Sequence, residues 1–171
     1  KSSNKFNLFN VLNLKKSLNF FFIDNILNRK KLNQTLNTIK PEFVFHLAAQ
    51  SLVGKSYDCP IETFETNVIG SLNILNASKK VPTIKSILMI TTDKVYKNDN
   101  KNRSFKENDV LGGSDPYSGS KSASEMAIAS FKNSFLKKKN KHKLAVLRSG
   151  NVIGGGDWNE GRIVPDIIKS I

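Results

Sequence analysis

The feature that most constrains the fold is a near-continuous apolar run at residues 43–49, FVFHLAA. A run of this kind is typical of a strand buried on both faces in a parallel sheet. Further apolar runs at 18–24, 84–91 and 144–148 predict additional strands. The chain is therefore expected to build its core around a buried sheet.

Helical segments lie between these predicted strands. Leu32, Leu36 and Ile39 have helical spacing within residues 29–39, and Pro41 ends that helix. Other helices are expected at 60–78, at 116–136 and from Pro165, with loops at 1–16 (containing one short helix), 93–114 and 150–161. The alternation predicts an α/β fold of the doubly wound class, a parallel sheet with helices on both faces.

The chain is strongly basic, with a formal net charge of +13 over 171 residues. Lysine and asparagine are both abundant along the whole length, which indicates a compositional bias rather than a binding surface. The densest basic cluster, residues 137–143, follows a predicted helix, and cations are expected at a helix C-terminus. We expect no nucleic-acid partner, and a basic nucleic-acid-binding protein is kept as the alternative from another class.

Cysteine and hydropathy patterns indicate the compartment. Cys59 is the only cysteine, so no internal disulfide is possible. No apolar run approaches the roughly 20 residues of a membrane helix, and the N-terminus lacks the apolar core of a signal peptide. No cluster of histidine, cysteine and acidic residues has the spacing of a metal site. The sequence predicts a cytoplasmic protein with no membrane or metal partner.

Tyr117 and Lys121 form the main candidate for chemistry. They are four residues apart in a predicted helix, so their side chains share one face. Pro116 suits the first helical position, and Asp115 precedes it as an N-cap. A positive charge favours the ionised form of a phenol, so the pair can transfer protons. The simpler alternative is a surface tyrosine and a surface lysine.

Polar residues follow three of the predicted strands, at 46–50, 91–96 and 149–158. Ligands of doubly wound sheets bind at the carboxyl ends of the strands, so these groups are expected to converge there. Thr92 can donate a hydrogen bond, Asp93 can act as a general acid and Lys94 supplies a cation or base. Each could instead belong to an ordinary strand end.

Two further segments suit a nucleotide ligand. Ala48, Ala49 and Gln50 are small or polar where a strand ends, so a flat cofactor could approach the backbone there. The glycine-rich loop at 151–158, followed by Arg162, suits a diphosphate. His46 is expected to be a core histidine satisfied by backbone groups.

Five motifs, in order, resemble the extended short-chain dehydrogenase/reductase superfamily. They are FHLAAQ (45–50), ETNVIGSLN (65–73), TTDKVY (91–96), DPYSGSKSASE (115–125) and RSGNVIGGGDW (148–158). Lys94, GGGDW and LGGSDPYS are similar to the CDP-glucose 4,6-dehydratase branch of that superfamily. The resemblance covers residues 8–171 and implies a Rossmann-type domain that binds NAD.

The resemblance also implies a mechanism on a nucleotide sugar, CDP-glucose. Tyr117 takes the proton of the sugar 4-hydroxyl while NAD accepts the hydride from carbon 4, and Lys121 favours the tyrosine phenolate and contacts the cofactor ribose. Thr92 hydrogen-bonds the reacting oxygen. Asp93 protonates the leaving 6-hydroxyl, and Lys94 lies where the carbon-5 proton is lost. Hydride return to carbon 6 then gives a 4-keto-6-deoxy sugar.

Other residue roles come from the same resemblance. The implied cofactor contacts, besides Tyr117 and Lys121, are Asn25, Ile26, Ala48, Ala49, Gln50, Asn67 and Thr91, and the implied substrate contacts are Ser56, Asn151 and Arg162. The helices at 60–78 and 116–136 are expected to pair with their copies in a homo-oligomer, with Met126 and Ile128 facing away from Tyr117.

The sequence departs from the superfamily pattern at its N-terminal side. No GxxGxxG phosphate loop precedes Phe43, and the acidic residue that would read the adenosine ribose is missing with it. Asn25-Ile26 stands where Asp-Ile is usual, and Gly54-Lys55 replaces a pair of arginines. We therefore expect a partial NAD-binding domain over 1–171, a fragment that lacks its first strands and most of the substrate domain, and that is inactive alone. A dTDP-glucose dehydratase or a nucleotide-sugar epimerase is the near alternative.

Overall fold

The computed structural model describes residues 7–100, 102–136 and 142–171. The chain divides into two compact units, Lys1–Ile23 with Asn151–Ile171, and Asp24–Gly150. The sheet and most of the predicted site residues belong to the unit Asp24–Gly150, called the sheet unit below; the other is called the terminal unit.

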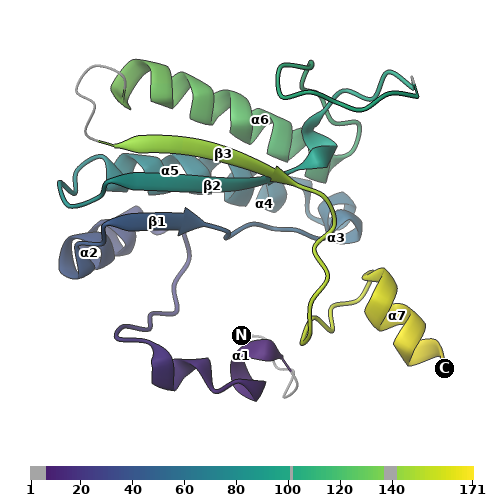
Figure 1. Cartoon of the computed structure of the whole chain (residues 1–171), viewed down its shortest axis with the longest axis horizontal. Helices are drawn as coiled ribbons and strands as arrows, with labels where there is room; N and C mark the ends of the chain where they lie inside the picture. Colours follow the sequence, from purple (N-terminus) through teal and green to yellow (C-terminus); the bar gives the residue numbers. More distant parts are fainter. Residues whose placement is uncertain (1–6, 101, 137–141) are drawn as a thin grey trace. The chain divides into compact units, whose positions relative to one another are not determined.

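Three parallel strands form the sheet, in the order β1-β2-β3 (Figure 1). They are β1 (Phe43–His46), β2 (Ser86–Thr92) and β3 (Lys143–Ser149). Ile87 of β2 lies opposite Val44 on one side and Leu144 on the other. The predicted strands at 84–91 and 144–148, and the parallel pairing, are therefore confirmed.

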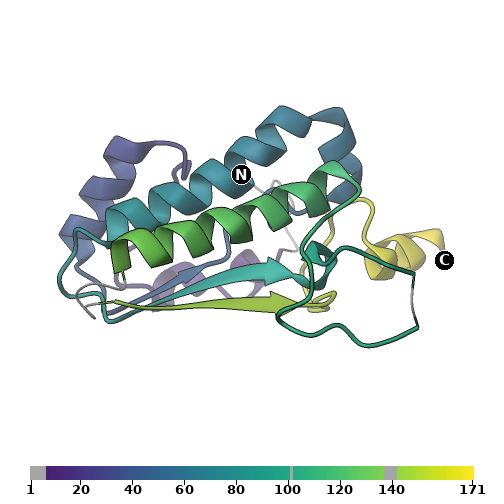
Figure 2. The ribbon, with the colours of Figure 1, turned by 90° about the horizontal axis from the view of Figure 1, so that it is seen from above.

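The helices of the sheet unit cover one face of the sheet (Figure 2). They are α2 (Arg29–Ile39), α3 (Val53–Asp58), α4 (Pro60–Phe64), α5 (Gly70–Ser78) and α6 (Pro116–Phe131), with π-helical turns η2 (Glu65–Ile69) and η4 (Lys132–Leu136) after α4 and α6. The helices predicted at 29–39, 60–78 and 116–136 are thus confirmed, whereas α3 was not predicted. Helices on both faces are not seen within this unit. The connections β1→β2→β3 run in one direction, and right-handed crossovers then place their helices on the same side. The helix α2 precedes β1 and packs against α5 in this layer.

The core lies between the sheet and this helical layer. Side chains of β2 alternate, so Ile87 and Met89 point into the layer and are almost fully buried. Leu75 of α5 and Ile128 of α6 pack against them from the helical side. Ile128 therefore faces the sheet, and the expectation that it faces away from Tyr117 is wrong; Met126 does lie exposed.

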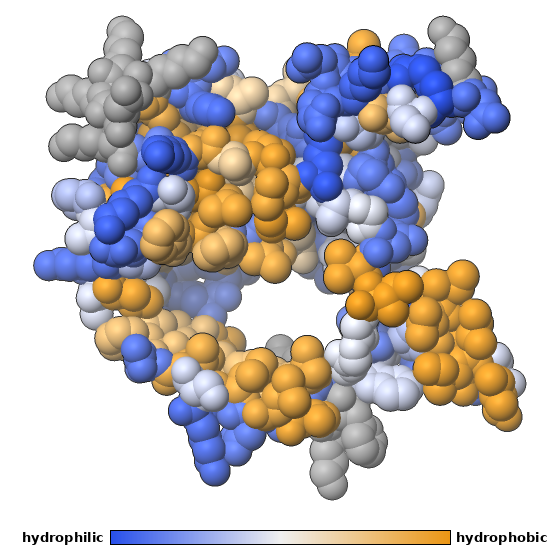
Figure 3. Space-filling view, in the orientation of Figure 1, coloured by the Kyte–Doolittle hydropathy of each residue, from blue (hydrophilic) through white to orange (hydrophobic). Residues whose placement is uncertain are grey.

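The opposite face of the sheet is apolar and uncovered within the sheet unit (Figure 3). Phe43, Phe45, Leu47 and Leu147 are all exposed. The prediction that the strand at 43–49 is buried on both faces is therefore wrong, and β1 ends at His46. The helices of the sheet unit lie on the other face, so the alternate side chains of β1 and β3 have no helix of this unit against them.

The strand predicted at 18–24 does not form. Residues 19–25 have no regular secondary structure, and Phe20, Phe22 and Ile23 are exposed. An isolated extended segment has no ladder for its backbone N–H and C=O groups, so apolar character alone does not make a strand. Among the described residues no strand pairs with it.

The terminal unit contains α1 (Leu8–Val11), the 3₁₀ turn η1 (Leu14–Ser17) and α7 (Ile163–Ser170). The rings of Phe9 and Phe21 stack with centroids 5.0 Å apart. The short helix expected within 1–16 and the last helix near Pro165 are both present. No helix among the described residues is long and apolar enough to cross a membrane. Most of the basic cluster 137–143 lies outside the described residues.

Candidate active site

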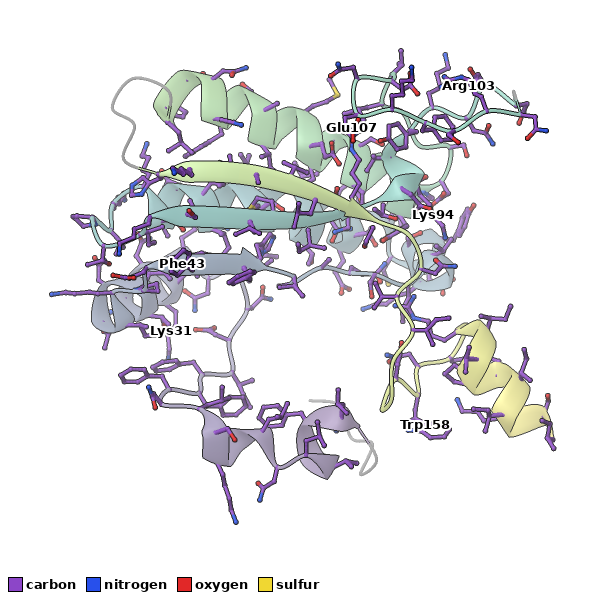
Figure 4. The ribbon with its side chains drawn as sticks, viewed as in Figure 1. Lys31, Phe43, Lys94, Arg103, Glu107 and Trp158 are labelled. Carbon is purple, nitrogen blue, oxygen red and sulfur yellow. The ribbon has the colours of Figure 1, made fainter. Side chains whose placement is uncertain are left out.

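Thr92, Asp93 and Lys94 lie where β2 ends and the 3₁₀ turn η3 (Asp93–Val95) begins. The Thr92 hydroxyl caps this turn, accepting from the Lys94 backbone N–H at 3.3 Å and donating to Asp93 Oδ1 at 3.1 Å. Thr92 is buried, whereas Asp93 and Lys94 are exposed at the carboxyl edge of the sheet (Figure 4). Gly150, just after β3, lies beside Asp93, because a Cβ there would be 3.6 Å from Asp93 Oδ2. The expected meeting of strand ends is therefore seen for β2 and β3.

The start of α6 is fixed by a capping box. Asp115 Oδ1 accepts from the backbone N–H groups of Tyr117 and Ser118 at 2.9 and 3.0 Å, as the N-cap prediction requires. Burial alone would raise the pKa of Asp115, but the hydrogen bonds from Ser118 and Tyr117 and the Lys94 charge outweigh it and lower that pKa. The ionised cap holds Tyr117, which is half-buried, in the first helical turn.

Lys121 extends from α6 toward β2. Its side chain is buried, and Nζ lies 3.4 Å from the carbonyl oxygen of Ile90, to which it donates. Burial lowers the pKa of Lys121, and the nearby Glu125 carboxylate opposes this shift. A buried ammonium one turn from Tyr117 is the arrangement that favours a phenolate.

His46 is a core residue, as predicted. Its Nε2 lies 3.1 Å from the Ser71 hydroxyl, so its partner is a side chain and not the expected backbone group. Burial, and secondarily the charge of Lys121, lower the pKa of His46 to about 4. The imidazole is therefore neutral at physiological pH, and we do not expect it to act as a general acid or base.

Gln50 and Asn67 connect the loop after β1 to the helical layer. Asn67 Oδ1 accepts from the Gln50 N–H at 2.9 Å, and its Nδ2 donates to the Gln50 carbonyl and to Ser120 Oγ at 3.1 and 2.8 Å. Gln50 Nε2 donates to Thr63 and Leu52. Because both carboxamides are buried and engaged within the protein, they position the loop after β1. The expected cofactor contacts of Gln50 and Asn67 stay predictions.

Two hydroxyls expected to bind ligands are also engaged within the protein. Ser56 is fully buried and donates to the Val53 carbonyl at 2.6 Å. Thr91 is buried and donates to Glu125 Oε1 at 2.6 Å. Both hydroxyls therefore donate to groups of the protein, and the expected substrate contact of Ser56 and cofactor contact of Thr91 stay predictions.

The remaining predicted residues lie in loops. Asn25 and Ile26 form a turn in which Asn25 Oδ1 accepts from the Leu27 N–H, and the Ile26 carbonyl accepts from Asn73 of α5. Ala48 is exposed and Ala49 half-buried after β1. The two predicted substrate contacts Asn151 and Arg162 belong to the terminal unit, where Arg162 Nε lies 3.4 Å from Asp157 Oδ2.

Sequence reasoning missed the ion pair between Glu125 and Arg148. Arg148 of β3 donates to both carboxylate oxygens of Glu125, and the two side chains are among the less exposed charged groups described. The available signal was Glu125 four residues after Lys121, on the face of α6 that already carries Tyr117. Within the described residues, no group of three potential metal ligands gathers.

These observations define a class: a parallel α/β protein with a Tyr–Lys pair and a Thr-Asp-Lys turn at the carboxyl edge of its sheet. A sequence model of the GDP-mannose 4,6 dehydratase family matches residues 1–140. The chain belongs to this family, within the Rossmann-fold epimerases and dehydratases that the sequence motifs resemble.

Individual relatives agree with this membership. The CDP-glucose 4,6-dehydratase of Salmonella typhimurium is 45% identical over 152 residues, covering 86% of this chain and 42% of that enzyme. The dTDP-D-glucose 4,6-dehydratase of Dictyostelium discoideum is 30% identical over 165 residues, covering 90% of this chain and 36% of that enzyme. The chain thus spans less than half the length of these relatives.

Solved structures match the fold. A Streptomyces venezuelae dTDP-glucose 4,6-dehydratase double mutant, with NAD and DAU bound, superposes with a TM-score of 0.81 at 20% identity, over 94% of this chain and 47% of that chain. The UDP-glucose 4-epimerase of Thermotoga maritima with UDP-glucose superposes with a TM-score of 0.76 at 28% identity, over 88% of this chain and 49% of that chain. The Rossmann-type class predicted from the sequence is confirmed.

Proposed function

We propose that this chain carries the catalytic edge of a CDP-glucose 4,6-dehydratase, which converts CDP-glucose to CDP-4-keto-6-deoxyglucose. The observation that carries the proposal is the Thr92-Asp93-Lys94 turn at the end of β2, beside the capped start of α6 that holds Tyr117 and Lys121. The 45% identity to a CDP-glucose 4,6-dehydratase supports the choice of nucleotide.

Tyr117 and Lys121 form the base of the first half-reaction. The buried Lys121 ammonium stabilises the Tyr117 phenolate, which removes the proton of the sugar 4-hydroxyl. The Thr92 hydroxyl donates to Asp93 in this structure. In the reaction it rotates to hydrogen-bond the oxygen at carbon 4 of the sugar. A 4-keto group makes the neighbouring carbon-5 proton acidic enough to remove.

Asp93 and Lys94 carry out the elimination. Asp93 is exposed at the edge and can protonate the leaving 6-hydroxyl, while Lys94 assists loss of the carbon-5 proton. Together they remove water across carbons 5 and 6 of the sugar, and the reaction has no net redox change once the hydride returns.

The cofactor we propose is NAD. The residues of this chain that would contact NAD fit it in part. Lys121 supplies a buried cation, and the small side chains of Ala48 and Ala49 leave the backbone after β1 accessible. Asn25 and Ile26 form a fixed turn. When bound, NAD accepts a hydride from carbon 4 and returns it to carbon 6. Residues 1–171 contain no GxxGxxG loop for its diphosphate. Asn151 and Arg162 are proposed contacts of the substrate diphosphate.

The test compares three nucleotide sugars with the protein at its natural length. CDP-glucose is expected to be converted with far higher kcat/KM than dTDP-glucose or UDP-glucose. Tyr117→Phe is expected to lower kcat by about 10²–10⁴-fold, because it removes the general base and leaves the ring in place. Conversion of UDP-glucose to UDP-galactose would instead assign an epimerase. Salt-sensitive binding of DNA or RNA, unaffected by Tyr117→Phe, would assign the nucleic-acid alternative.

We also propose that the protein works in the cytoplasm as a homo-oligomer that pairs the helical segments 60–78 and 116–136 with their copies. Ile61, Ile69 and Met126 are exposed apolar residues of this helical layer. Sedimentation of the natural-length protein, compared with its Met126→Asp variant, tests this: a lower mass is expected for the variant, because a buried carboxylate would oppose pairing.

A further inference from the structure

Glu125 lies in the same stripe of α6 as Tyr117 and Lys121, at successive four-residue steps. It is 6% exposed, which is unusual for a carboxylate, and burial of a charge requires compensation. The proposed reaction assigns Glu125 no contact with substrate or cofactor.

Compensation comes from two strands. Arg148 Nε of β3 donates to both carboxylate oxygens at 3.0 Å, Arg148 Nη2 donates to Oε2, and the Thr91 hydroxyl of β2 donates to Oε1 at 2.6 Å. Glu125 thereby joins α6 to both strands at the level of the site.

Arg148 is itself held from its other side. Its Nη1 donates to the Glu107 carbonyl at 2.9 Å, and its guanidinium lies 4.6 Å from the ring centroid of Tyr96. The Tyr96 ring stacks in turn on Phe105, with centroids 4.7 Å apart. Figure 4 marks Glu107 and Arg103 in this loop. The loop after β2 therefore fixes the guanidinium that fixes Glu125.

We propose that Glu125 is a positioning residue of the Tyr117–Lys121 pair: it lies one helical turn after Lys121 in α6, and its carboxylate, anchored by Arg148 and Thr91, keeps the buried Lys121 ammonium charged. The proposal rests on the proposed function for its consequence in catalysis. The opposing influence of Glu125 on the lowered Lys121 pKa agrees with it.

Among the charged groups near Lys121, Glu125 is the one that opposes the fall of the Lys121 pKa. β1 contributes His46, which is neutral, and β2 (SILMITT) carries no ionisable side chain. The turn η3 contributes Asp93 and Lys94, of opposite sign. β3 contributes Arg148, whose charge Glu125 neutralises.

Two substitutions then have opposite effects on Lys121. Glu125→Gln removes the carboxylate and leaves Arg148 unneutralised nearby, so the Lys121 pKa is expected to fall by about one unit or more. Arg148→Met leaves the Glu125 carboxylate unneutralised, so the Lys121 pKa is expected to rise. Glu125→Asp keeps the carboxylate on a side chain one methylene shorter, so the Lys121 pKa is expected to fall less than in Glu125→Gln.

The measurement is an NMR titration of the lysine ε-methylene signals of the natural-length protein, with Lys121 identified by its absence in Lys121→Met. Glu42→Gln is the matched control, since it removes the same charge from an exposed pair with Lys85. No shift is expected in this control. Shifts of Glu125→Gln and Arg148→Met in the same direction, or no shift in either, would overturn the proposal. Glu125→Asp carries the test if the other variants do not fold.

Kinetics separate this inference from the proposed function. The alkaline limb of kcat/KM for CDP-glucose is expected to move to lower pH in Glu125→Gln and to recover largely in Glu125→Asp. If the Lys121 pKa shifts as expected but the protein has no dehydratase activity, the positioning role of Glu125 stands and the proposed function is refuted. If the protein is an active dehydratase but the Lys121 pKa does not change in the variants, the proposed function stands and the positioning role is refuted.

Discussion

His46 illustrates how burial decides what an ionisable side chain does in this chain. It is buried beneath the helical layer with one hydroxyl partner, Ser71, and the charge of Lys121 lies nearby. Ser71 is also bonded to the Asn67 carbonyl and to Ser124. An imidazolium here would lose water and gain a like-charged neighbour, so the neutral form is retained.

The pH dependence of stability follows from this shift. The pKa of His46 falls from 6.5 to about 4 on folding, so the unfolded chain binds the proton first. The contribution of His46 is present above pH 6.5 and is lost as the pH falls toward 4, by roughly 3 kcal/mol in total. Urea unfolding at several pH values should show this loss in the wild type and a smaller one in His46→Gln.

The control for this experiment is the second histidine of the chain. His142→Gln is expected to retain the wild-type loss of stability, because His46 is still present. Equal losses in the wild type and His46→Gln would show that His46 is not the group responsible.

At the scale of elements, the 112–114 loop can lie close to the start of α6 because residue 113 is a glycine and has no side chain. A Cβ at Gly113 would overlap the backbone of Ser118 and Gly119, and backbone cannot move aside cheaply. Gly113→Ala is expected to lower the free energy of unfolding by about 1–3 kcal/mol and to displace the capped turn that holds Tyr117. Chemical denaturation measures the first effect.

Gly54 provides the matched control for this substitution. It lies inside α3, and a Cβ added there would have no neighbouring atom within 4 Å. Gly54→Ala is expected to stabilise the protein by up to about 1 kcal/mol, because alanine loses less backbone freedom in a helix. Equal effects of the two substitutions would contradict the steric account of Gly113.

The elements that the sequence predicts well are those whose signals are local. The Asp115-Pro116 start of α6 and the helical spacing of 29–39 depend on neighbours in the chain, and both are confirmed. The failures depend on distant partners. The run at 18–24 predicts a strand but has no strand to pair with among the described residues. The segment 43–49 has helices of the sheet unit on one side only.

The same distinction applies to the site. Residue types at strand ends indicate Thr92, Asp93 and Lys94 correctly as edge residues, because parallel strands end together. The inward roles of Asn67 and Thr91 follow from hydrogen bonds across elements. Such bonds have no signature in residue spacing, and neither does the Glu125–Arg148 pair.

At the scale of the whole molecule, the sheet unit exposes an apolar face that includes Phe43, Phe45 and Leu147. Within the described residues both outer strands, β1 and β3, also have a free edge. Exposed apolar area and unpaired edges reduce stability and favour association. A 171-residue chain expressed alone is therefore expected to have a free energy of unfolding below the roughly 5 kcal/mol usual for domains.

Weak cofactor binding is expected for the same isolated chain. The Tyr117–Lys121 edge is present, but residues 1–171 contain no glycine-rich turn of the GxxGxxG type whose backbone N–H groups could hold the NAD diphosphate. A dissociation constant above roughly 100 µM is expected by calorimetric titration, with much tighter binding by the natural-length protein. Binding of NAD by the isolated chain in the low micromolar range would contradict this expectation. It would mean that another part of the chain holds the diphosphate, and the NAD affinities of the Lys121→Met and Arg162→Ala variants would show whether either group does.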